Sequence, residues 1–248
     1  MNFIQISLTT KCNYGCEYCP ITQYRNTQPH WPISNSDLIP FMDRCLANGS
    51  VVASDCIVEL TGGEPALYVG INEFIDYLVG NGFYVLIKTN GIVEIPKHKQ
   101  VLRVAAYHQL ERVPESFDVM LVIHDTPDFD EKVAYCINNN VPFEILGKDK
   151  TPWYSDEHLF EKCSFINPAG HNCSCQDDKP LEIVSPDNSV DYGRIPFQDH
   201  MKWRDCCHPC KAAADAWKFL KYFDDFAVPN IVHTITESTL ADGSEITI

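Results

Sequence analysis

Short apolar runs alternate with amphipathic stretches along the first 150 residues of the chain. The apolar runs have the length and the Val, Ile, Leu and Phe content of buried strands. They cover residues 3–8, 56–60, 83–87, 101–107, 117–123 and 141–146. Between them, apolar residues recur at helical spacing after Ser36, across residues 71–79 and after Thr126, and we expect Ser36 and Thr126 to be helix N-caps. Strands that are apolar throughout, separated by helices, predict a parallel sheet with helices outside it.

Polar or glycine-rich segments follow these strands. They are the cysteine-containing loop 12–19, Gly62 to Pro65, Lys88 to Gly91, His108, and His124 with Asp125. In a sheet of parallel strands, all of these segments would lie at one edge, the C-terminal rim, where β/α barrels carry their sites. The predicted fold is therefore α/β, a partial (β/α)6 TIM-like barrel with a small cysteine-rich appendage of a hairpin and a helix at its C-terminal end.

The loop after the first strand carries a CxxxCxxC motif, formed by Cys12, Cys16 and Cys19. Three thiols so close in sequence can close around one metal centre, and three thiolates leave one iron of an iron–sulfur cube without a protein ligand. An open coordination position is what chemistry at a metal needs. A zinc site lacking its fourth ligand, or buried cysteines without a metal, are the alternatives that the spacing alone leaves open.

The alternation of strands and helices stops at about residue 151. Residues 151–180 are polar and contain three cysteines, which predicts irregular structure. The elements expected beyond them are a hairpin at 181–184 and 190–192, a helix from about Lys211, and strands around Asp242-Gly243. We therefore divide the chain into a barrel domain, residues 1–150, and a cysteine-rich appendage with a C-terminal tail, residues 151–248.

The composition is that of a soluble globular protein, with 45% hydrophobic and 21% charged residues in a chain of 248. No apolar run is long enough to span a bilayer and the N-terminus has no secretory signal pattern, so we expect a cytoplasmic protein with no membrane partner. The net charge of −15 and the absence of a dense Lys/Arg run argue against a nucleic-acid partner. In that compartment, most of the twelve cysteines are expected to be metal ligands rather than disulfides. Cys45, Cys56 and Cys136 lie inside apolar patterns and are expected to be core residues.

The CxxxCxxC motif after the first strand, followed by Gly-Gly-Glu-Pro at 62–65 after the second, resembles the radical S-adenosylmethionine (SAM) superfamily. The resemblance covers residues 1–147 in the order and spacing of the motifs. It implies that Cys12, Cys16 and Cys19 bind a [4Fe-4S] cluster whose fourth iron is chelated by SAM. It also implies that reductive cleavage of SAM gives a 5′-deoxyadenosyl radical that abstracts hydrogen from a substrate. A reductant protein such as flavodoxin or ferredoxin would supply the electron.

The resemblance further implies which residues contact SAM. Tyr18 is expected to contact the adenine. The backbone of Gly62 and Gly63 and the carboxylate of Glu64 are expected to contact the methionine end. Thr89 and Asn90 are expected to contact the ribose or the carboxylate of SAM. From the residues alone, an ordinary turn, plain packing of the tyrosine and a helix-leading turn after Thr89 stay open as alternatives. His108 and His124 follow strands and are candidate catalytic residues, as substrate contacts or proton donors, because histidine titrates near neutrality. A structural role at the rim is the alternative for both.

Six late cysteines form a second group. They are Cys163, Cys173, Cys175, Cys206, Cys207 and Cys210. With the expected hairpin, they resemble the SPASM and twitch appendages, which implies an auxiliary, second [4Fe-4S] cluster. The chain departs from that pattern at 192–194, where Tyr-Gly-Arg stands in place of a cysteine after the hairpin. A structural zinc site is the rival, because paired cysteines serve either metal.

The expected substrate is a peptide or a small molecule, the classes on which family members with auxiliary clusters often act. Because the motif begins at Cys12, no additional N-terminal peptide-binding domain is expected. The alternative in another reaction class is a rearrangement enzyme resembling the 7-carboxy-7-deazaguanine synthases, and the late cysteines count against it. A metal-binding scaffold without catalysis is the non-enzymatic alternative, against which the intact cysteine motif and Glu64 argue.

Overall fold

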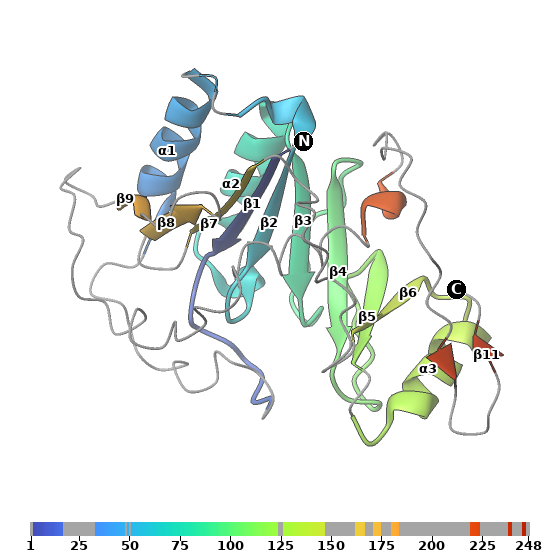
Figure 1. Cartoon of the computed structure of the whole chain (residues 1–248). Coiled ribbons are helices and arrows are strands. Elements are labelled where there is room, and N and C mark those ends of the chain that lie inside the picture. The colour runs from blue at the N-terminus through green and yellow to red at the C-terminus, as the bar shows by residue number, and fades with distance from the viewer. Residues whose placement is uncertain are drawn as a thin grey trace.

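The computed structural model describes residues 2–16, 33–47, 49, 51–123, 126–146, 162–166, 171–174, 180–183, 219–223, 238–239 and 245–246. Its centre is a nine-stranded sheet in the order β6-β5-β4-β3-β2-β1-β7-β8-β9 (Figure 1). The first six strands are β1 (Asn2–Ser7), β2 (Cys56–Thr61), β3 (Tyr84–Thr89), β4 (Val101–Tyr107), β5 (Val119–Ile123) and β6 (Phe143–Leu146). Each of them pairs in parallel with the next, so their C-terminal ends lie at one edge of the sheet.

The helices between these strands are α1 (Asn35–Ala47), α2 (Ile71–Gly80) and α3 (Phe129–Asn138). Two single turns of 3-10 helix, η2 (Ala53–Asp55) and η3 (Pro65–Leu67), lie before and after β2. A parallel sheet of six strands in sequence order with helices packed on it confirms the predicted α/β partial barrel. The prediction rested on the continuous apolar runs, because a strand that is buried on both faces has apolar side chains on both faces.

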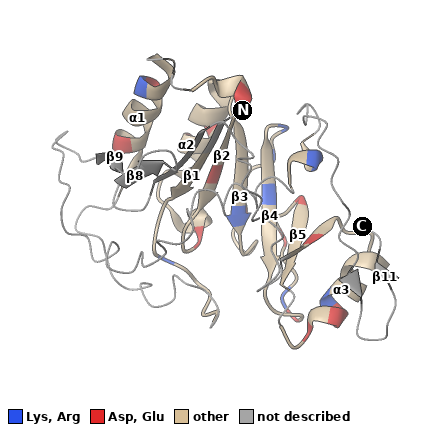
Figure 2. Ribbon diagram, viewed as in Figure 1, with Lys and Arg blue, Asp and Glu red and all other residues tan. Residues whose placement is uncertain are grey.

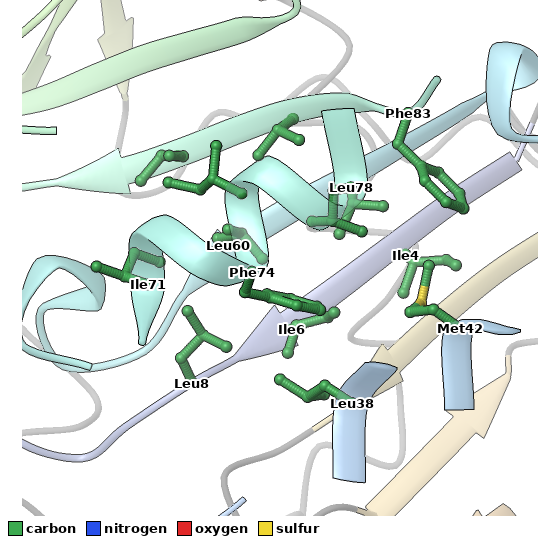
Figure 3. Close-up of a cluster of buried hydrophobic side chains, with 14 of the residues drawn as sticks. Ile4, Ile6, Leu8, Leu38, Met42, Leu60, Ile71, Phe74, Leu78 and Phe83 are labelled. Atoms are coloured by element: carbon green, nitrogen blue, oxygen red, sulfur yellow. The ribbon is translucent and has the colours of Figure 1, made fainter. Parts of the chain in front are cut away.

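The largest core lies between β1–β3 and the helices α1 and α2. Ile4, Ile6 and Leu8 alternate along β1 and its continuation, and all three point toward these helices (Figure 3). Phe74 and Leu78 come down from α2 to meet them, and both are fully buried. A second cluster joins β4 and β5 to α3, and its buried members are Tyr107, Met120, Val122, Val133 and Cys136.

The opposite, inner face of the sheet is covered at the N-terminal ends of the strands by a short segment from far along the chain. It contains η4 (Leu220–Tyr222), whose Leu220 is fully buried. The ring of Phe223 packs edge-on against Tyr84 at the start of β3, with centroids 5.4 Å apart. The hydroxyl of Tyr222 donates to the carboxylate of Glu144 on β6 at 2.8 Å. This segment therefore covers the end of the inner face that lies away from the rim.

Three further strands extend the sheet beyond β1. They are β7 (Lys162–Ile166), which is parallel to β1, and β8 (His171–Ser174) and β9 (Pro180–Ile183), which are antiparallel to their neighbours. The expectation of irregular structure across residues 151–180 is therefore wrong for β7 and β8. The strand expected at 181–184, the first arm of the predicted hairpin, is confirmed by β9. β7 was missed because it is short and polar and pairs with the sheet edge formed by the distant strand β1, which no local pattern reveals. The division of the chain at residue 150 stays a prediction.

Two helix starts differ from those expected. The side chain of Asp37 accepts hydrogen bonds from both the backbone nitrogen and the hydroxyl of Ser34, so α1 is capped at Ser34 and not at Ser36. The hydroxyl of Thr126 donates to the carbonyl of Ile123, and α3 begins only at Phe129. Both errors arise because Ser and Thr side chains bond to several nearby backbone groups, and the sequence does not say which.

At the C-terminal end, β10 (Ser238–Thr239) and β11 (Glu245–Ile246) pair antiparallel, which confirms the strands expected around Asp242-Gly243. Of the helix expected from Lys211, the structure describes residues 219–223, which contain the 3-10 turn η4. The second arm of the expected hairpin, residues 190–192, lies outside the described residues. In the described part of the chain, no helix has the length and apolar character needed to cross a bilayer.

Candidate functional site

The turn after β2 lies directly against the first residues of the cysteine loop. The backbone nitrogen of Gly63 donates to the carbonyl of Thr9 at 2.6 Å, and that of Glu64 donates to the carbonyl of Lys11 at 2.7 Å. These bonds continue the parallel ladder between β1 and β2 beyond the ends of both strands. The glycine turn is thus a backbone support for the loop that carries Cys12 and Cys16.

The contact is so close that a side chain at either glycine would collide with backbone atoms. A Cβ atom on Gly62 would lie 2.5 Å from the carbonyl oxygen of Thr9, and Gly62 has a positive φ of 134°. A Cβ atom on Gly63 would meet the carbonyl oxygen of Lys11 at a shorter distance still. Only glycine fits both positions, because backbone atoms cannot move aside as a flexible side chain can. The family resemblance predicts that this backbone approaches the methionine end of SAM, and that contact stays a prediction; the close neighbour among the described residues is the cysteine loop.

Glu64 points inward and joins the turn to the end of β3. Its carboxylate accepts from the hydroxyl of Thr89 at 2.6 Å, from the backbone nitrogen of Asn90 at 2.7 Å and from the backbone nitrogen of Ala66 at 3.0 Å. The side chain is 1% exposed. Burial raises the pKa of the Glu64 carboxyl, and the three hydrogen bonds oppose that shift.

The end of β3 also contacts the cysteine loop. The amide of Asn90 donates to the side-chain oxygen of Asn13 at 2.6 Å, and Asn13 lies between the first two motif cysteines. The backbone nitrogen of Gly91 donates to the hydroxyl of Thr89 at 3.0 Å, which fixes the turn that leaves the strand. The structure thus brings Glu64, Thr89 and Asn90 together at the rim, as the sequence predicted.

Cys12 and Cys16 are half-buried cysteines on this loop. The sulfur of Cys12 accepts a hydrogen bond from the backbone nitrogen of Tyr14 at 3.4 Å. The sulfur of Cys16 lies 3.3 Å from Nδ1 of His108, which directly follows β4. Each described motif sulfur therefore has a nitrogen at hydrogen-bonding distance.

His108 lies between the cysteine loop and α3. Its ring packs on the ring of Tyr14, with centroids 5.0 Å apart. Its carbonyl oxygen accepts from the ammonium of Lys132 at 2.9 Å, and that fully buried ammonium also pairs with Asp128 at 2.8 Å. Burial and, after it, the charge of Lys132 lower the pKa of His108 to about 4, so the imidazole is neutral at pH 7.

A network of polar side chains lies on the inner face of the sheet and joins the three neighbouring strands β1, β2 and β3. Gln5 on β1 donates to one oxygen of Glu59 on β2 at 2.5 Å, and Lys88 on β3 pairs with the other oxygen at 3.1 Å. Figure 2 shows this acidic position on β2 and the basic position on β3 within a sheet whose strands carry few other charges. The carboxylate of Glu59 is fully buried, so the ammonium of Lys88 is the group that balances its charge.

Several predicted site residues lie outside the described residues. They are Tyr18, Cys19, His124, Cys175, Cys206, Cys207 and Cys210. Cys163 lies in β7 and Cys173 lies in β8, where it pairs with Phe165 of the neighbouring strand. The roles predicted for all of these residues stay predictions.

Sequence reasoning missed three residues of the rim. Asn13 and Tyr14 lie inside the cysteine motif at positions that its spacing leaves unspecified, and Lys132 was assigned no role from the sequence. Lys132 is fully buried in the first turn of α3. A lysine among the apolar positions of that helix was the one available signal.

The described donors fit the metal group that the motif implies. Cys12 and Cys16 supply thiol sulfurs, the ligand type of iron–sulfur clusters, on a loop whose backbone is held by the glycine turn. Neither forms a disulfide with another described cysteine. Among the described residues, no group of three His, Cys, Asp or Glu side chains gathers around one point, and the third motif cysteine lies outside them.

The chain is similar to curated enzymes over part of its length, although no protein-family model matches it. It is 28% identical to the GTP 3′,8-cyclase of Campylobacter fetus subsp. fetus over 123 residues, 48% of this chain and 35% of that enzyme. It is 28% identical to the S-adenosylmethionine-dependent nucleotide dehydratase of Selenomonas ruminantium over 165 residues, 66% of this chain and 52% of that enzyme. The chain thus spans between about a third and a half of the length of these relatives.

Among solved structures, SuiB of Streptococcus suis bound to S-adenosylmethionine aligns with a TM-score of 0.44 and 17% identity, over 62% of this chain and 40% of that chain. The similarity to the cyclase and the dehydratase supports the resemblance to the radical SAM superfamily that the cysteine and glycine motifs indicate. It also supports the interpretation of the chain as an enzyme rather than as a scaffold without catalysis.

Proposed function

We propose that the protein is a radical SAM enzyme whose cluster is held by Cys12, Cys16 and Cys19. The observation that carries the proposal is the contact between the Gly62-Gly63 turn and the cysteine loop. Two motifs about fifty residues apart in sequence lie within backbone hydrogen-bonding distance at the C-terminal rim of a partial barrel. Neither motif alone would require the other, and a shared cofactor explains why they lie together.

When bound, a [4Fe-4S] cluster would supply the electron that cleaves SAM to a 5′-deoxyadenosyl radical. The residues of the chain position the reactants for this step and shield them from water. The bonds from Gly63 and Glu64 to the loop backbone hold Cys12 and Cys16 in place, and the amide pair of Asn13 and Asn90 ties the same loop to β3.

The SAM contacts proposed for Tyr18, Gly62, Gly63, Glu64, Thr89 and Asn90 follow from the same arrangement. The carboxylate of Glu64 receives three donors from the described residues, and a carboxylate has about four acceptor positions, so it can take one more donor such as an ammonium group. Thr89 and Asn90 would act in two ways, by orienting Glu64 and by lining the place where the ribose or carboxylate lies.

The proposed substrate is a peptide or a small molecule, and electrons would come from a flavodoxin- or ferredoxin-like protein. The two relatives are named for GTP and for a nucleotide, which makes nucleotides the first small molecules to test. His124 and His108 are proposed to lie near the substrate as contacts or proton donors. The net charge of −15 is no obstacle to a small anion, because a local basic group can act inside an acidic surface.

We further propose an auxiliary [4Fe-4S] cluster on the late cysteines, with structural zinc as the alternative. The donors come from Cys163, Cys173, Cys175, Cys206, Cys207 and Cys210. The first two lie in adjacent strands, β7 and β8, which continue the sheet from β1. A metal held there would lie on an extension of the barrel sheet itself.

The cluster and the cleavage of SAM can be tested together. Wild-type protein is reconstituted anaerobically with iron and sulfide, reduced with dithionite and given SAM, and 5′-deoxyadenosine is quantified. Cys16→Ser should abolish 5′-deoxyadenosine formation. Cys45→Ser, which alters a half-buried cysteine of α1 away from the rim, should retain it. A wild-type protein that binds a cluster but forms no 5′-deoxyadenosine contradicts the proposed function.

The auxiliary site is tested by metal analysis of a variant with Cys12, Cys16 and Cys19 all changed to Ala. About four irons per chain in this variant support a second cluster, and about one zinc per chain supports the zinc alternative. A variant that holds neither metal contradicts both.

A further inference from the structure

The sulfur of Cys16 and Nδ1 of His108 lie 3.3 Å apart, although the two residues are separated by 92 positions in sequence. The contact crosses from the loop after β1 to the residue after β4, on the far side of β2 and β3 in the sheet order. It is also partly buried, which lowers the competition from water. Such a contact at the rim needs a reason beyond chain connectivity.

The imidazole of His108 is held in this position from two other sides. Its ring packs on Tyr14 of the cysteine loop, and its backbone carbonyl accepts from the buried ammonium of Lys132. Lys132 is in turn fixed by its ion pair with Asp128, the residue directly before α3. The packing on Tyr14 restrains the ring itself, and the bond from Lys132 fixes the backbone from which the ring extends toward the sulfur.

We propose that His108 donates an Nδ1–H hydrogen bond to the thiolate of Cys16 and thereby raises the reduction potential of the cluster that this thiolate ligates. This inference rests on the proposed function. A metal-bound thiolate carries no proton, so the proton in a bond between these two atoms belongs to Nδ1. Hydrogen bonds to ligating sulfurs are one of the main factors that set the potential of an iron–sulfur cluster.

The direction of the effect follows from charge. Adding an electron makes the cluster and its thiolates more negative, and a donor aimed at a sulfur stabilises that extra charge more than it stabilises the oxidised form. The bond from His108 therefore favours reduction. On this account His108 is a positioning residue that acts through Cys16, a role different from the substrate contact expected from its place at a strand end.

The test compares three histidine variants of the full chain by potentiometric titration of the reconstituted cluster without SAM, followed by EPR of the reduced form. His108→Phe keeps a ring of similar size but removes the donor, and its potential should shift to a more negative value. His108→Asn can place an amide N–H close to the position of Nδ1, and it should recover most of the wild-type potential. His98→Phe changes an exposed histidine just before β4, at the opposite end of that strand, and should leave the potential unchanged.

The outcomes separate this inference from the proposed function. A wild-type protein that assembles no cluster contradicts the proposed function itself. A cluster that assembles in wild type and in His108→Phe with equal potentials overturns the inference and leaves the proposed function standing.

A second measurement applies if His108→Phe fails to fold or to bind iron. Wild-type protein is labelled with 15N-histidine, and the reduced cluster is examined by pulsed EPR. A weak coupling to a histidine nitrogen is expected through the hydrogen bond, and its absence overturns the inference without any variant.

Discussion

The hydroxyl of Thr89 donates a hydrogen bond of 2.6 Å to the carboxylate of Glu64, and this bond joins the turn after β2 to the C-terminal end of β3. Both residues are almost fully buried. Glu64 also accepts a hydrogen bond from the backbone nitrogen of Asn90, whose side-chain amide donates to Asn13 of the cysteine loop. The carboxylate of Glu64 therefore links the turn after β2, the end of β3 and the cysteine loop. A change at Thr89 should affect the stability of all three segments.

Replacing Thr89 by Val removes the hydroxyl at nearly constant volume. The carboxylate of Glu64 then loses a donor in a buried place, and we expect the free energy of unfolding to fall by about 1.5–3 kcal/mol, the usual range for hydrogen bonds to charged groups. Thr89→Ser keeps the hydroxyl and loses one methyl group, so it should cost only about 0.8 kcal/mol. Urea unfolding under reducing conditions measures both, and equal losses would contradict a role for the hydroxyl.

Gly63 is the second sensitive position of the rim. In Gly63→Ala the new methyl group would meet the carbonyl oxygen of Lys11, and we expect a loss at or above the upper end of the range of about 1–3 kcal/mol seen for overpacking. The matched control is Gly80→Ala at the end of α2, where nothing lies within 4 Å of the added atom. That change should stabilise the protein by up to about 1 kcal/mol.

The two variants add the same methyl group, at Gly63 against a backbone carbonyl and at Gly80 in open space. Urea denaturation of both gives the comparison directly. A Gly63→Ala variant as stable as Gly80→Ala would mean that the turn and the cysteine loop are not in contact in solution.

The sequence was sufficient to predict the six parallel strands and the rim. Buried strands such as β5 are apolar along their whole length, and polar residues such as Thr89 and Asn90 mark where a strand ends. This information is local, because it depends on which residues can be buried and which cannot. It therefore also gave the common edge at which the motifs gather.

The contacts within the rim could not be predicted in the same way. Nothing near Cys16 in the sequence points to His108, since their proximity depends on the curvature of the sheet and on the exact ends of β1 and β4. The strand β7 was missed for a related reason, because it gains its hydrogen bonds from the open edge of β1 and not from its own pattern. Side-chain partners and edge pairings are properties of the assembled sheet.

The ion pair between Glu59 and Lys88 should contribute strongly to stability. In Lys88→Met the buried carboxylate of Glu59 loses its positive partner, a change that costs about 3–5 kcal/mol for fully buried pairs. Because Lys88 is partly exposed, we expect a loss near the lower end of that range. Glu59→Gln removes the charge while keeping an acceptor for Gln5, and should cost less.

A double-mutant cycle separates the pair from its surroundings. The variant with both Glu59→Gln and Lys88→Met should lose less stability than the sum of the two single losses, with an interaction free energy of about 0.5–3 kcal/mol. Urea unfolding of the four proteins gives this value. Losses that simply add would show that the two side chains do not interact in solution.

The pair of Arg103 and Asp118 should make stability depend on pH in the acid range. Arg103 donates to both oxygens of Asp118, at 3.0 and 2.8 Å, and its backbone nitrogen donates as well. Burial alone would raise the pKa of Asp118, but the hydrogen bonds and charge of Arg103 outweigh it and hold the pKa below its usual range. A carboxyl whose pKa is lower in the folded state stabilises the fold above its unfolded pKa of about 3.9, and this contribution is lost as the pH falls through the folded value.

Replacing Asp118 by Asn removes this contribution to stability at neutral pH. In acid the wild-type carboxylate is itself protonated and no longer makes the contribution, so the substitution has little effect there. We therefore expect Asp118→Asn to lower the free energy of unfolding by about 1.5–3 kcal/mol at pH 7, and the difference from wild type to shrink as the pH is lowered below about 4. Asp76→Asn, at an exposed position of α2, serves as the control and should stay within about 0.5 kcal/mol of wild type. Urea unfolding at a series of pH values measures the difference, and a gap for Asp118→Asn that stays constant or widens in acid would contradict the lowered pKa.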